Sequence, residues 1–258
     1  MNNPFSDLNN KTVIITGGLG FMAKQYTSVF VSYGCKVILL DIKKKYQNQK
    51  KNITYIKCDI TNEDEVSKAL KFIKKKFGEI NILINNASVD HVPDIKNENK
   101  FSIEKFDLNL WQKDLSVGLS GAFICSKIFG TIMSKQKMGG NIINISSDLG
   151  IISPDNRIYP DNFIKPVSYS VVKHGIIGLT KYVSTYWASK NIRCNCFAPG
   201  GMYNKQNPQF INNIKKLIPL NRMSKKNEYN YIILFLASNA SSYINGTTIV
   251  ADGGRSIW

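Results

Sequence analysis

The stretch TVIITGGLGFMA, residues 12–23, joins a short β-branched run to a turn of small residues and the start of an amphipathic pattern. Val and Ile dominate the run, as is typical of a strand that is buried on both faces of a parallel sheet. In the turn, Gly18-x-Gly20-x-x-Ala23 is one form of the dinucleotide-binding fingerprint, whose small residues let the backbone approach a pyrophosphate. The helix that follows would point its N-terminus at the phosphates. Glycines are common at strand–helix turns, so this segment needs support from the rest of the chain.

Similar apolar runs recur along the chain and alternate with longer amphipathic stretches. The other runs are KVILLD (36–41), ITYIKC (53–58), NILIN (81–85), NIINIS (141–146), IRCNCF (192–197) and TTIVA (247–251). Helical patterns cover 20–33, 62–77, 104–135, 168–190 and 225–238. The alternation predicts an α/β fold, a Rossmann-like doubly wound parallel sheet of about seven strands with helices on both faces. Because no repeat, linker or low-complexity tract marks a boundary, we expect a single domain over residues 1–258.

The formal net charge of the chain is +16, which leaves nucleic acid, an anionic membrane or a phosphorylated substrate open as partners. Much of the surplus lies in lysine-rich helical segments such as KFIKKKF (71–77). No basic stripe interleaved with aromatic residues and no nucleic-acid motif accompanies the charge. We therefore interpret the lysines as solvated helix faces and expect no nucleic-acid partner.

The N-terminal MNNPFSDLNNK lacks the basic start and apolar run of a signal peptide, and no run of about 18 consecutive apolar residues is present. The five cysteines are scattered without a CxxC pair, which favours small buried side chains in a reducing compartment over disulfides. We expect a cytoplasmic protein with no membrane partner and no metal ion.

Asp41 ends the second apolar run, eighteen positions after Ala23. This is close to the spacing expected for a carboxylate that accepts hydrogen bonds from the adenosine ribose, and it favours NAD over NADP. Lys43, Lys44 and Lys45 follow directly and could neutralise a 2′-phosphate, so NADP stays open.

Tyr169 and Lys173 stand four positions apart on a predicted helix, and this spacing places the phenol and the ammonium on one face. An adjacent cation favours the phenolate, which can exchange a proton with a substrate hydroxyl or carbonyl. A Tyr-x-x-x-Lys pair by itself is common by chance on surface helices.

The motifs taken in order make the chain resemble the short-chain dehydrogenase/reductase family along essentially its whole length. They are TGGLG (16–20), Asp41, CDI (58–60), NNAS (85–88), NISS (144–147), YSVVK (169–173), PGG (199–201) and DGG (252–254). The resemblance implies an oxidoreductase that interconverts an alcohol and a ketone with NAD, or with NADP. It also implies a homodimer or homotetramer formed through the long helices predicted at 104–135 and 168–190.

The resemblance assigns roles to individual residues. Ser147 would hold the substrate oxygen, while Tyr169 and Lys173 would do the proton work, with Lys173 also gripping the nicotinamide ribose. The Asp59 side chain would contact adenine. The implied cofactor-binding residues are Gly17, Gly18, Leu19, Gly20, Phe21, Met22, Asp41, Asp59, Ile60, Asn86, Ala87, Tyr169, Lys173, Pro199, Gly200 and Met202.

Three positions depart from the family pattern. The first turn is one residue shorter than the usual TGxxxGxG. Gly118 occupies the place of an Asn that normally anchors a water in the proton relay from the catalytic lysine. Asn204 replaces a Thr near the nicotinamide amide, and an amide can serve there as a hydrogen-bond partner.

The 22 positions from Ser147 to Tyr169 exceed the usual family spacing, so the segment 148–166 carries an insertion. Long loops in compact domains tend to be lids or binding loops. Arg157 and Tyr159 in this segment, together with His91 and Asn204, are our candidates for substrate contacts. Their polar chemistry suits a polyhydroxylated or phosphorylated ligand.

A finer resemblance concerns the substrate. The run YSVVKHGIIGLTKYVSTYWASKNIRCN and the segments PGGMYN, LIPLNRM and DGGRSIW are similar to oxidoreductases of bacterial surface-sugar pathways, including flagellin modification and nonulosonic acid synthesis. That similarity implies a sugar or sugar-phosphate substrate. A 3-ketoacyl-thioester reductase and a cofactor-binding protein that has lost turnover remain as alternatives.

Overall fold

The computed structural model describes residues 4–43, 51–91, 100–159 and 163–258, and its strands form a seven-stranded parallel sheet. The strands are β1 (Thr12–Thr16), β2 (Lys36–Asp41), β3 (Ile53–Lys57), β4 (Ile82–Asn85), β5 (Gly140–Ile145), β6 (Ile192–Pro199) and β7 (Thr248–Ala251). Their order in space is β3-β2-β1-β4-β5-β6-β7. The predicted fold class is confirmed, and the strand order reverses between β1 and β4.

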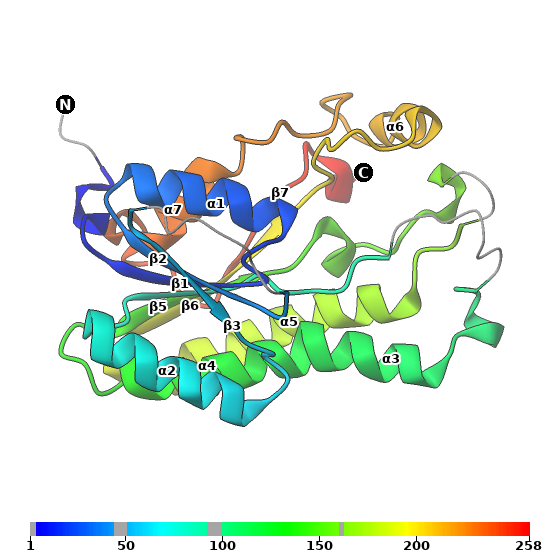
Figure 1. The fold of residues 1–258 in the computed structure, drawn as a ribbon. Helices are drawn as coiled ribbons and strands as arrows, with labels where there is room; N and C mark the ends of the chain where they lie inside the picture. Colours follow the sequence, from blue (N-terminus) through cyan, green and yellow to red (C-terminus); the bar gives the residue numbers. More distant parts are fainter. Residues whose placement is uncertain (1–3, 44–50, 92–99, 160–162) are drawn as a thin grey trace.

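Helices cover both faces of the sheet (Figure 1). On one face lie α1 (Phe21–Ser32) and α7 (Asn230–Ala237), and on the other lie α2 (Glu63–Phe77), α4 (Gly121–Met133) and α5 (Val167–Tyr186). β1 supplies both cores, because its side chains alternate: Val13 and Ile15 pack toward Tyr26 of α1, whereas Ile14 packs toward Phe129 of α4.

Local sequence explains where α2 begins and ends. The Asn62 side chain accepts hydrogen bonds from the backbone N–H groups of Asp64 and Glu65, at 3.0 and 3.1 Å. Acidic residues fill the first turn and lysines the last, as the helix dipole favours. The helix stops at Gly78, whose φ of +77° suits a residue without a side chain.

Two helical predictions need correction, and one helix was missed. The helix expected over 104–135 runs from Leu108 to Met133, with a π-helical turn at Ser116–Ser120 between α3 (Leu108–Leu115) and α4. The helix expected over 225–238 is confined to α7, which begins at Asn230. Helix α6 (Pro208–Lys215) was not predicted, although Asn207 caps it by accepting from Gln209 N and Pro208 occupies its first turn.

The run Leu108–Met133 is long and apolar enough, by length and composition only, to cross a membrane. The expectation from the sequence was narrower, that no run of about 18 consecutive apolar residues is present, and Lys113, Asp114 and Lys127 interrupt this segment. In this fold α4 packs against α2, α5 and the sheet, as a core helix does (Figure 1).

A buried polar network ties the centre of the sheet to the helices that carry the site. Asn85 Nδ2 donates to Ser126 Oγ of α4 and to Asn144 Oδ1 of β5, at 3.0 and 2.7 Å. Asn144 Nδ2 in turn donates to Thr180 Oγ1 of α5, at 2.9 Å. β4, β5, α4 and α5 are thereby fixed in register by hydrogen bonds as well as by apolar packing.

Asn144→Leu should therefore destabilise the fold although it makes the core more apolar. The change removes the acceptor of Asn85 and the donor to Thr180, and a buried polar group left unpaired costs about 1–3 kcal/mol. Urea unfolding would measure the loss. Asn212→Leu on the exposed side of α6 is the matched control and should change stability by less than about 0.5 kcal/mol. Equal effects of the two variants would contradict the role of the network.

Candidate active site

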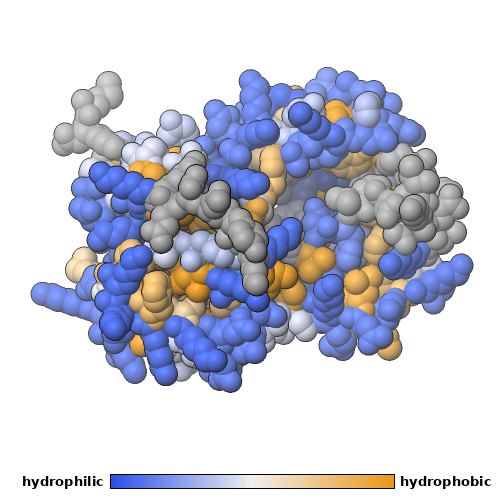
Figure 2. All heavy atoms as spheres, viewed as in Figure 1, coloured by the Kyte–Doolittle hydropathy of each residue, from blue (hydrophilic) through white to orange (hydrophobic). Residues whose placement is uncertain are grey.

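A cleft of about 1210 Å³ opens at the carboxyl ends of the strands, where the strand order reverses. In Figure 2 the surface is hollowed between the part that carries α6 and the part that carries α3, with hydrophilic side chains around it. Most of the predicted site residues line this cleft: Gly17, Leu19, Gly20, Phe21, Met22, Asp41, Asp59, Ile60, Asn86, Ala87, His91, Ser147, Tyr159, Tyr169, Lys173, Pro199, Gly200, Met202 and Asn204.

The first turn has the form that a pyrophosphate requires. Gly17 has a φ of +60°, and a Cβ there would stand 2.9 Å from Ala87 Cα, so no larger residue fits without a shift. Gly20 precedes α1, whose N-terminus receives no side-chain cap and has no acidic residue in its first turn. Phe21 and Met22 bring this uncapped end to the cleft, where backbone N–H groups and the helix dipole favour an anion.

Gly18 does not line the cleft, and its predicted cofactor contact needs correction. A Cβ on Gly18 would stand 2.5 Å from the Leu39 Cβ. The Gly18 N–H also donates to the Leu40 carbonyl of β2, at 3.0 Å. Gly18 thus serves the close packing of the turn against the neighbouring strand, which a local motif cannot distinguish from ligand contact.

The Asp41 side chain, at the end of β2, is hydrogen-bonded to the same turn. Its Oδ2 accepts from Leu19 N at 2.9 Å, and its Oδ1 accepts from Lys43 N at 3.0 Å. The carboxylate is thus oriented at the end of β2, where the sequence predicted a ribose contact. Lys44 and Lys45, the counter-signal for NADP, lie outside the described residues.

The NNAS segment is fastened to the first strand. Thr16 Oγ1 accepts from both Asn86 N and Ala87 N, each at 3.0 Å, and Asn86 Nδ2 donates to Thr16 O at 3.0 Å. This clamp joins the ends of β1 and β4. It fixes the distance between these two ends at the cleft, where the segments that follow β1 and β4 lead to opposite faces of the sheet.

The phenol and the ammonium share the N-terminal half of α5, as predicted. Lys173 Nζ donates to the Ile145 carbonyl at 3.1 Å and lies 5.5 Å from the centre of the Tyr169 ring. Burial lowers the pKa of Lys173 to about 8. Burial also raises the pKa of Tyr169 well above its usual value, and the charge of Asp90 adds to this, whereas a hydrogen bond with Ser147 opposes it. Before the charge of an oxidised nicotinamide is added, the tyrosine therefore holds its proton.

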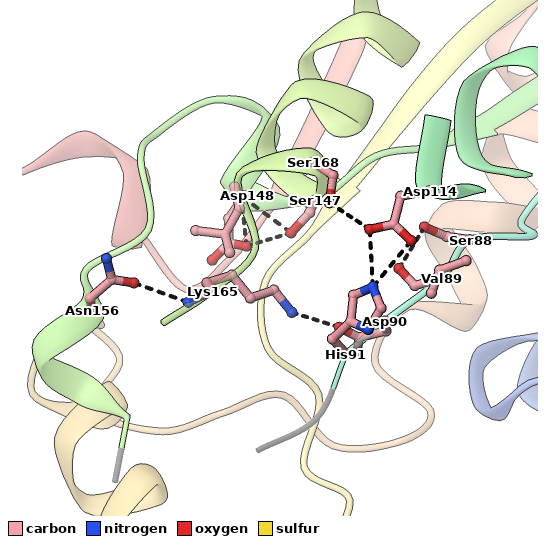
Figure 3. Close-up of polar contacts among 11 residues, drawn as sticks. Ser88, Val89, Asp90, His91, Asp114, Ser147, Asp148, Asn156, Lys165 and Ser168 are labelled. Carbon is pink, nitrogen blue, oxygen red and sulfur yellow. Dashed lines mark hydrogen bonds and ion pairs between the residues drawn. The ribbon is translucent and has the colours of Figure 1, made fainter. Parts of the chain in front are cut away.

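Ser147 is held by a buried ion pair that sequence reasoning missed. Its Oγ donates to Asp148 Oδ1 at 2.7 Å (Figure 3). Asp148 Oδ2 accepts from Arg255 Nη1, also at 2.7 Å. Both charged side chains are about 95% buried. Arg255 comes from the end of the chain, where Asp252 accepts from the N–H groups of Gly254 and Ser256. The DGGR sequence was the signal that could have led to it.

Gly118 lies in the π-helical turn and faces α5. A Cβ at this position would stand only 2.5 Å from Val172 Cγ1. A Val172 methyl group thus fills the space that a side chain at residue 118 would enter. The packing of α5 against this turn therefore leaves no room for the Asn that the family carries at this position.

The four candidate substrate residues have different surroundings. Tyr159 and Asn204 line the cleft, as does His91, whose Nε2 lies 3.0 Å from Asp114 Oδ2 (Figure 3). Arg157 does not line it: its side chain is 89% exposed and forms an ion pair with Asp155, at 2.8 Å. The prediction that Arg157 faces the substrate is thus not supported, because a nearer carboxylate engages the guanidinium.

Comparison with known proteins agrees with this geometry. A family model described as Enoyl-(Acyl carrier protein) reductase matches residues 21–256. The chain is 28% identical to an NAD-dependent glycerol dehydrogenase of Listeria innocua, with 97% of this chain and 96% of that protein covered. It is 30% identical to a 7α-hydroxysteroid dehydrogenase of Bacteroides fragilis, with 96% and 95% covered.

Solved structures give the same picture. A short-chain dehydrogenase from Leptospira borgpetersenii with bound NAD⁺ superposes with a TM-score of 0.86 at 30% identity, over 100% of this chain and 97% of that one. The aldohexose dehydrogenase of Thermoplasma acidophilum superposes with a TM-score of 0.84 at 29% identity, over 98% and 97%.

Replacing Asp41 by Ala should weaken the binding of NAD by roughly tenfold or more, since hydrogen bonds to a charged group contribute about 1.5–3 kcal/mol. NADP binding should change less, because its 2′-phosphate is repelled by the carboxylate. Titration with the reduced cofactors, followed by nicotinamide fluorescence, would measure both constants. Equal losses for the two cofactors would remove Asp41 as the selector.

Gly118→Asn should destabilise the protein by about 1–3 kcal/mol through overpacking against Val172. Val172→Ala should relieve part of this cost, so the double variant should be more stable than the sum of the single changes predicts. A double-mutant cycle in urea would reveal the coupling. Costs that add within about 0.5 kcal/mol would show that the two side chains do not compete for one space.

Proposed function

Because this chain belongs to the short-chain dehydrogenase/reductase family, we propose that it acts on a sugar or sugar-phosphate substrate in the synthesis of surface carbohydrate. It is an oxidoreductase that interconverts alcohol and ketone groups, and its cofactor is a nicotinamide dinucleotide, NAD or NADP. The observation that carries the substrate proposal is the polar wall next to Tyr169. Lys165 lies against the Tyr169 ring and pairs with Asp90, and both line the cleft, as do His91, Asn204 and Gln206.

The residues around the reacting carbon divide the work. Ser147 Oγ is turned by Asp148 into the cleft, where it can exchange that partner for the substrate oxygen. Tyr169 takes the proton of the hydroxyl during oxidation and returns it during reduction. The ammonium of Lys173 favours the phenolate form by its charge. The nicotinamide, when bound, supplies the hydride acceptor or donor and, in its oxidised form, a further positive charge.

A second candidate substrate is a 3-ketoacyl thioester. Phe210, Ile214 and Met223 form an apolar side of the cleft that would suit an acyl chain. The relatives described above include a glycerol and a steroid dehydrogenase, so both polar and apolar substrates occur among similar proteins. We favour the sugar because the polar residues lie on the side of Tyr169, where the reacting carbon must be.

We further propose a homodimer or homotetramer in the cytoplasm. Phe123 of α4 and Tyr182 and Tyr186 of α5 are 52%, 66% and 63% exposed, and these helices are the ones expected to associate. Large exposed aromatic side chains on neighbouring helices are typical of interfaces. All five cysteines are free and buried, which suits a reducing compartment.

Tyr169→Phe should reduce hydride transfer at least about a hundredfold, because it removes the group that moves the proton. Binding of NADH should stay within about threefold of the parent. Tyr243→Phe, at a fully exposed position, is the control and should leave turnover unchanged. Initial rates of NAD reduction would be measured with a panel of sugars, sugar phosphates and nucleotide sugars, and with a 3-hydroxyacyl thioester. Preference for the thioester would overturn the sugar assignment, and retained turnover in the Phe variant would overturn the role of Tyr169.

A further inference from the structure

A second lysine lies against the reacting tyrosine. Lys165 Nζ stands 4.0 Å from the centre of the Tyr169 ring, nearer than Lys173 Nζ at 5.5 Å. The Lys165 side chain is only 10% exposed and lines the cleft. A group bound to this ammonium would therefore sit beside the phenol that exchanges the proton.

Lys165 is held in place from both sides. Its backbone N–H donates to Asn156 Oδ1 at 3.2 Å, and it stands two residues before the start of α5. Its ammonium reaches across the mouth of the cleft to Asp90 Oδ1, at 2.6 Å, on the segment that follows β4 (Figure 3). The ion pair thus bridges the inserted segment and the loop after β4, at the entrance that a substrate must use.

Lys165 and Asp90 differ in burial, and this difference decides which of the two a ligand can replace. The Asp90 side chain is 63% exposed, so it can turn toward solvent without being stripped of water. Ion pairs with an exposed partner contribute only about 0.2–1 kcal/mol. Lys165 is confined by the tyrosine ring and keeps its position when Asp90 leaves.

The buried carboxylates near the phenol already have partners of their own. Asp148 pairs with Arg255 at 2.7 Å, and Asp114 lies 3.0 Å from His91 Nε2 and accepts from Ser168 Oγ. Asp90, at 2.6 Å, is the carboxylate that pairs with Lys165, and it is the exposed one. The Lys165 ammonium is therefore a cation beside the phenol whose partner a ligand can displace.

We propose that Lys165 binds a carboxylate of the substrate, so that the sugar-like substrate is a sugar acid whose reacting hydroxyl lies near the acid group. Asp90 shows that this ammonium binds a carboxylate, at 2.6 Å. An ammonium has three N–H donors, so Lys165 can serve the carboxylate while Asp90 turns outward. This inference rests on the proposed sugar substrate and makes its chemical class more specific.

Calorimetric titration of the protein saturated with NADH would test the site with D-glucuronate, D-glucose and glucose 6-phosphate as probes. The parent should bind glucuronate about tenfold or more tightly than glucose, as expected for a charge-assisted contact. Lys165→Met should abolish this preference and leave glucose within about twofold. Lys165→Arg should retain it, because a guanidinium also binds carboxylates.

Two further variants separate this site from a general effect of charge. Asp90→Asn removes the competing carboxylate and should tighten glucuronate binding by about threefold or more. Lys181→Met removes the same charge from an exposed position on α5 and should change nothing. Weaker glucuronate binding by Asp90→Asn, or an equal loss with Lys181→Met, would overturn the proposal.

The remaining outcomes are also decisive. Equal binding of glucose and glucuronate by the parent, tighter binding of glucose 6-phosphate, or no binding of any probe would each overturn the carboxylate site. Turnover of a neutral sugar or sugar phosphate that depends on Tyr169 but not on Lys165 would leave the proposed function intact and refute only this inference. Turnover confined to the acyl thioester would refute the proposed function itself.

Discussion

The structure depends on the pairing of β1 with β2 on one side and with β4 on the other. Because the chain builds the sheet outward from β1 to β3 and then returns to β4, the connections after β1 and β4 leave toward opposite faces. At the carboxyl ends of the strands this divergence leaves a crevice between the two connections. The cleft results from this divergence of the two connections. Thr16 Oγ1 holds the ends of β1 and β4 together by accepting from Asn86 N and Ala87 N.

Each wall of the cleft then receives a different kind of chemistry. The side of β1 and β2 offers an uncapped helix N-terminus and one oriented carboxylate, which suit a dinucleotide. The side of β5 and α5 offers a hydroxyl, a phenol and ammonium groups in a buried setting. Burial raises the pKa of the phenol and lowers that of Lys173, so the surroundings move both groups away from their ordinary pKa values.

The buried charge of Asp148 in this site is paired with an opposite charge. Asp148 holds Ser147 on one side and Arg255 on the other, and an unpaired charge at such depth would be costly. The end of the chain thus supports Ser147, although the two lie far apart in sequence. Lys165 and Asp90 form a different kind of pair, with one member confined and the other in water. A buried pair supports geometry, whereas a half-exposed pair can exchange partners with a ligand.

The sequence by itself determined the seven strands, the glycine-rich turn, the helical spacing of Tyr169 and Lys173, and the place of Asp41. These features follow from the periodicity of apolar residues and from short spacings along the chain. A strand that is buried on both faces, or a shared helix face, constrains residues that are near in sequence. The family resemblance added the place of Ser147. The interruption by a π-helical turn at Gly118, the packing role of Gly18 and the outward direction of Arg157 were decided only by the tertiary structure. So were the contacts of Asp148 with Arg255, 107 residues apart, and of Asp90 with Lys165, 75 residues apart. The physical reason is that such contacts depend on where distant segments return over the sheet, and no local pattern of burial records which charged side chains will meet there.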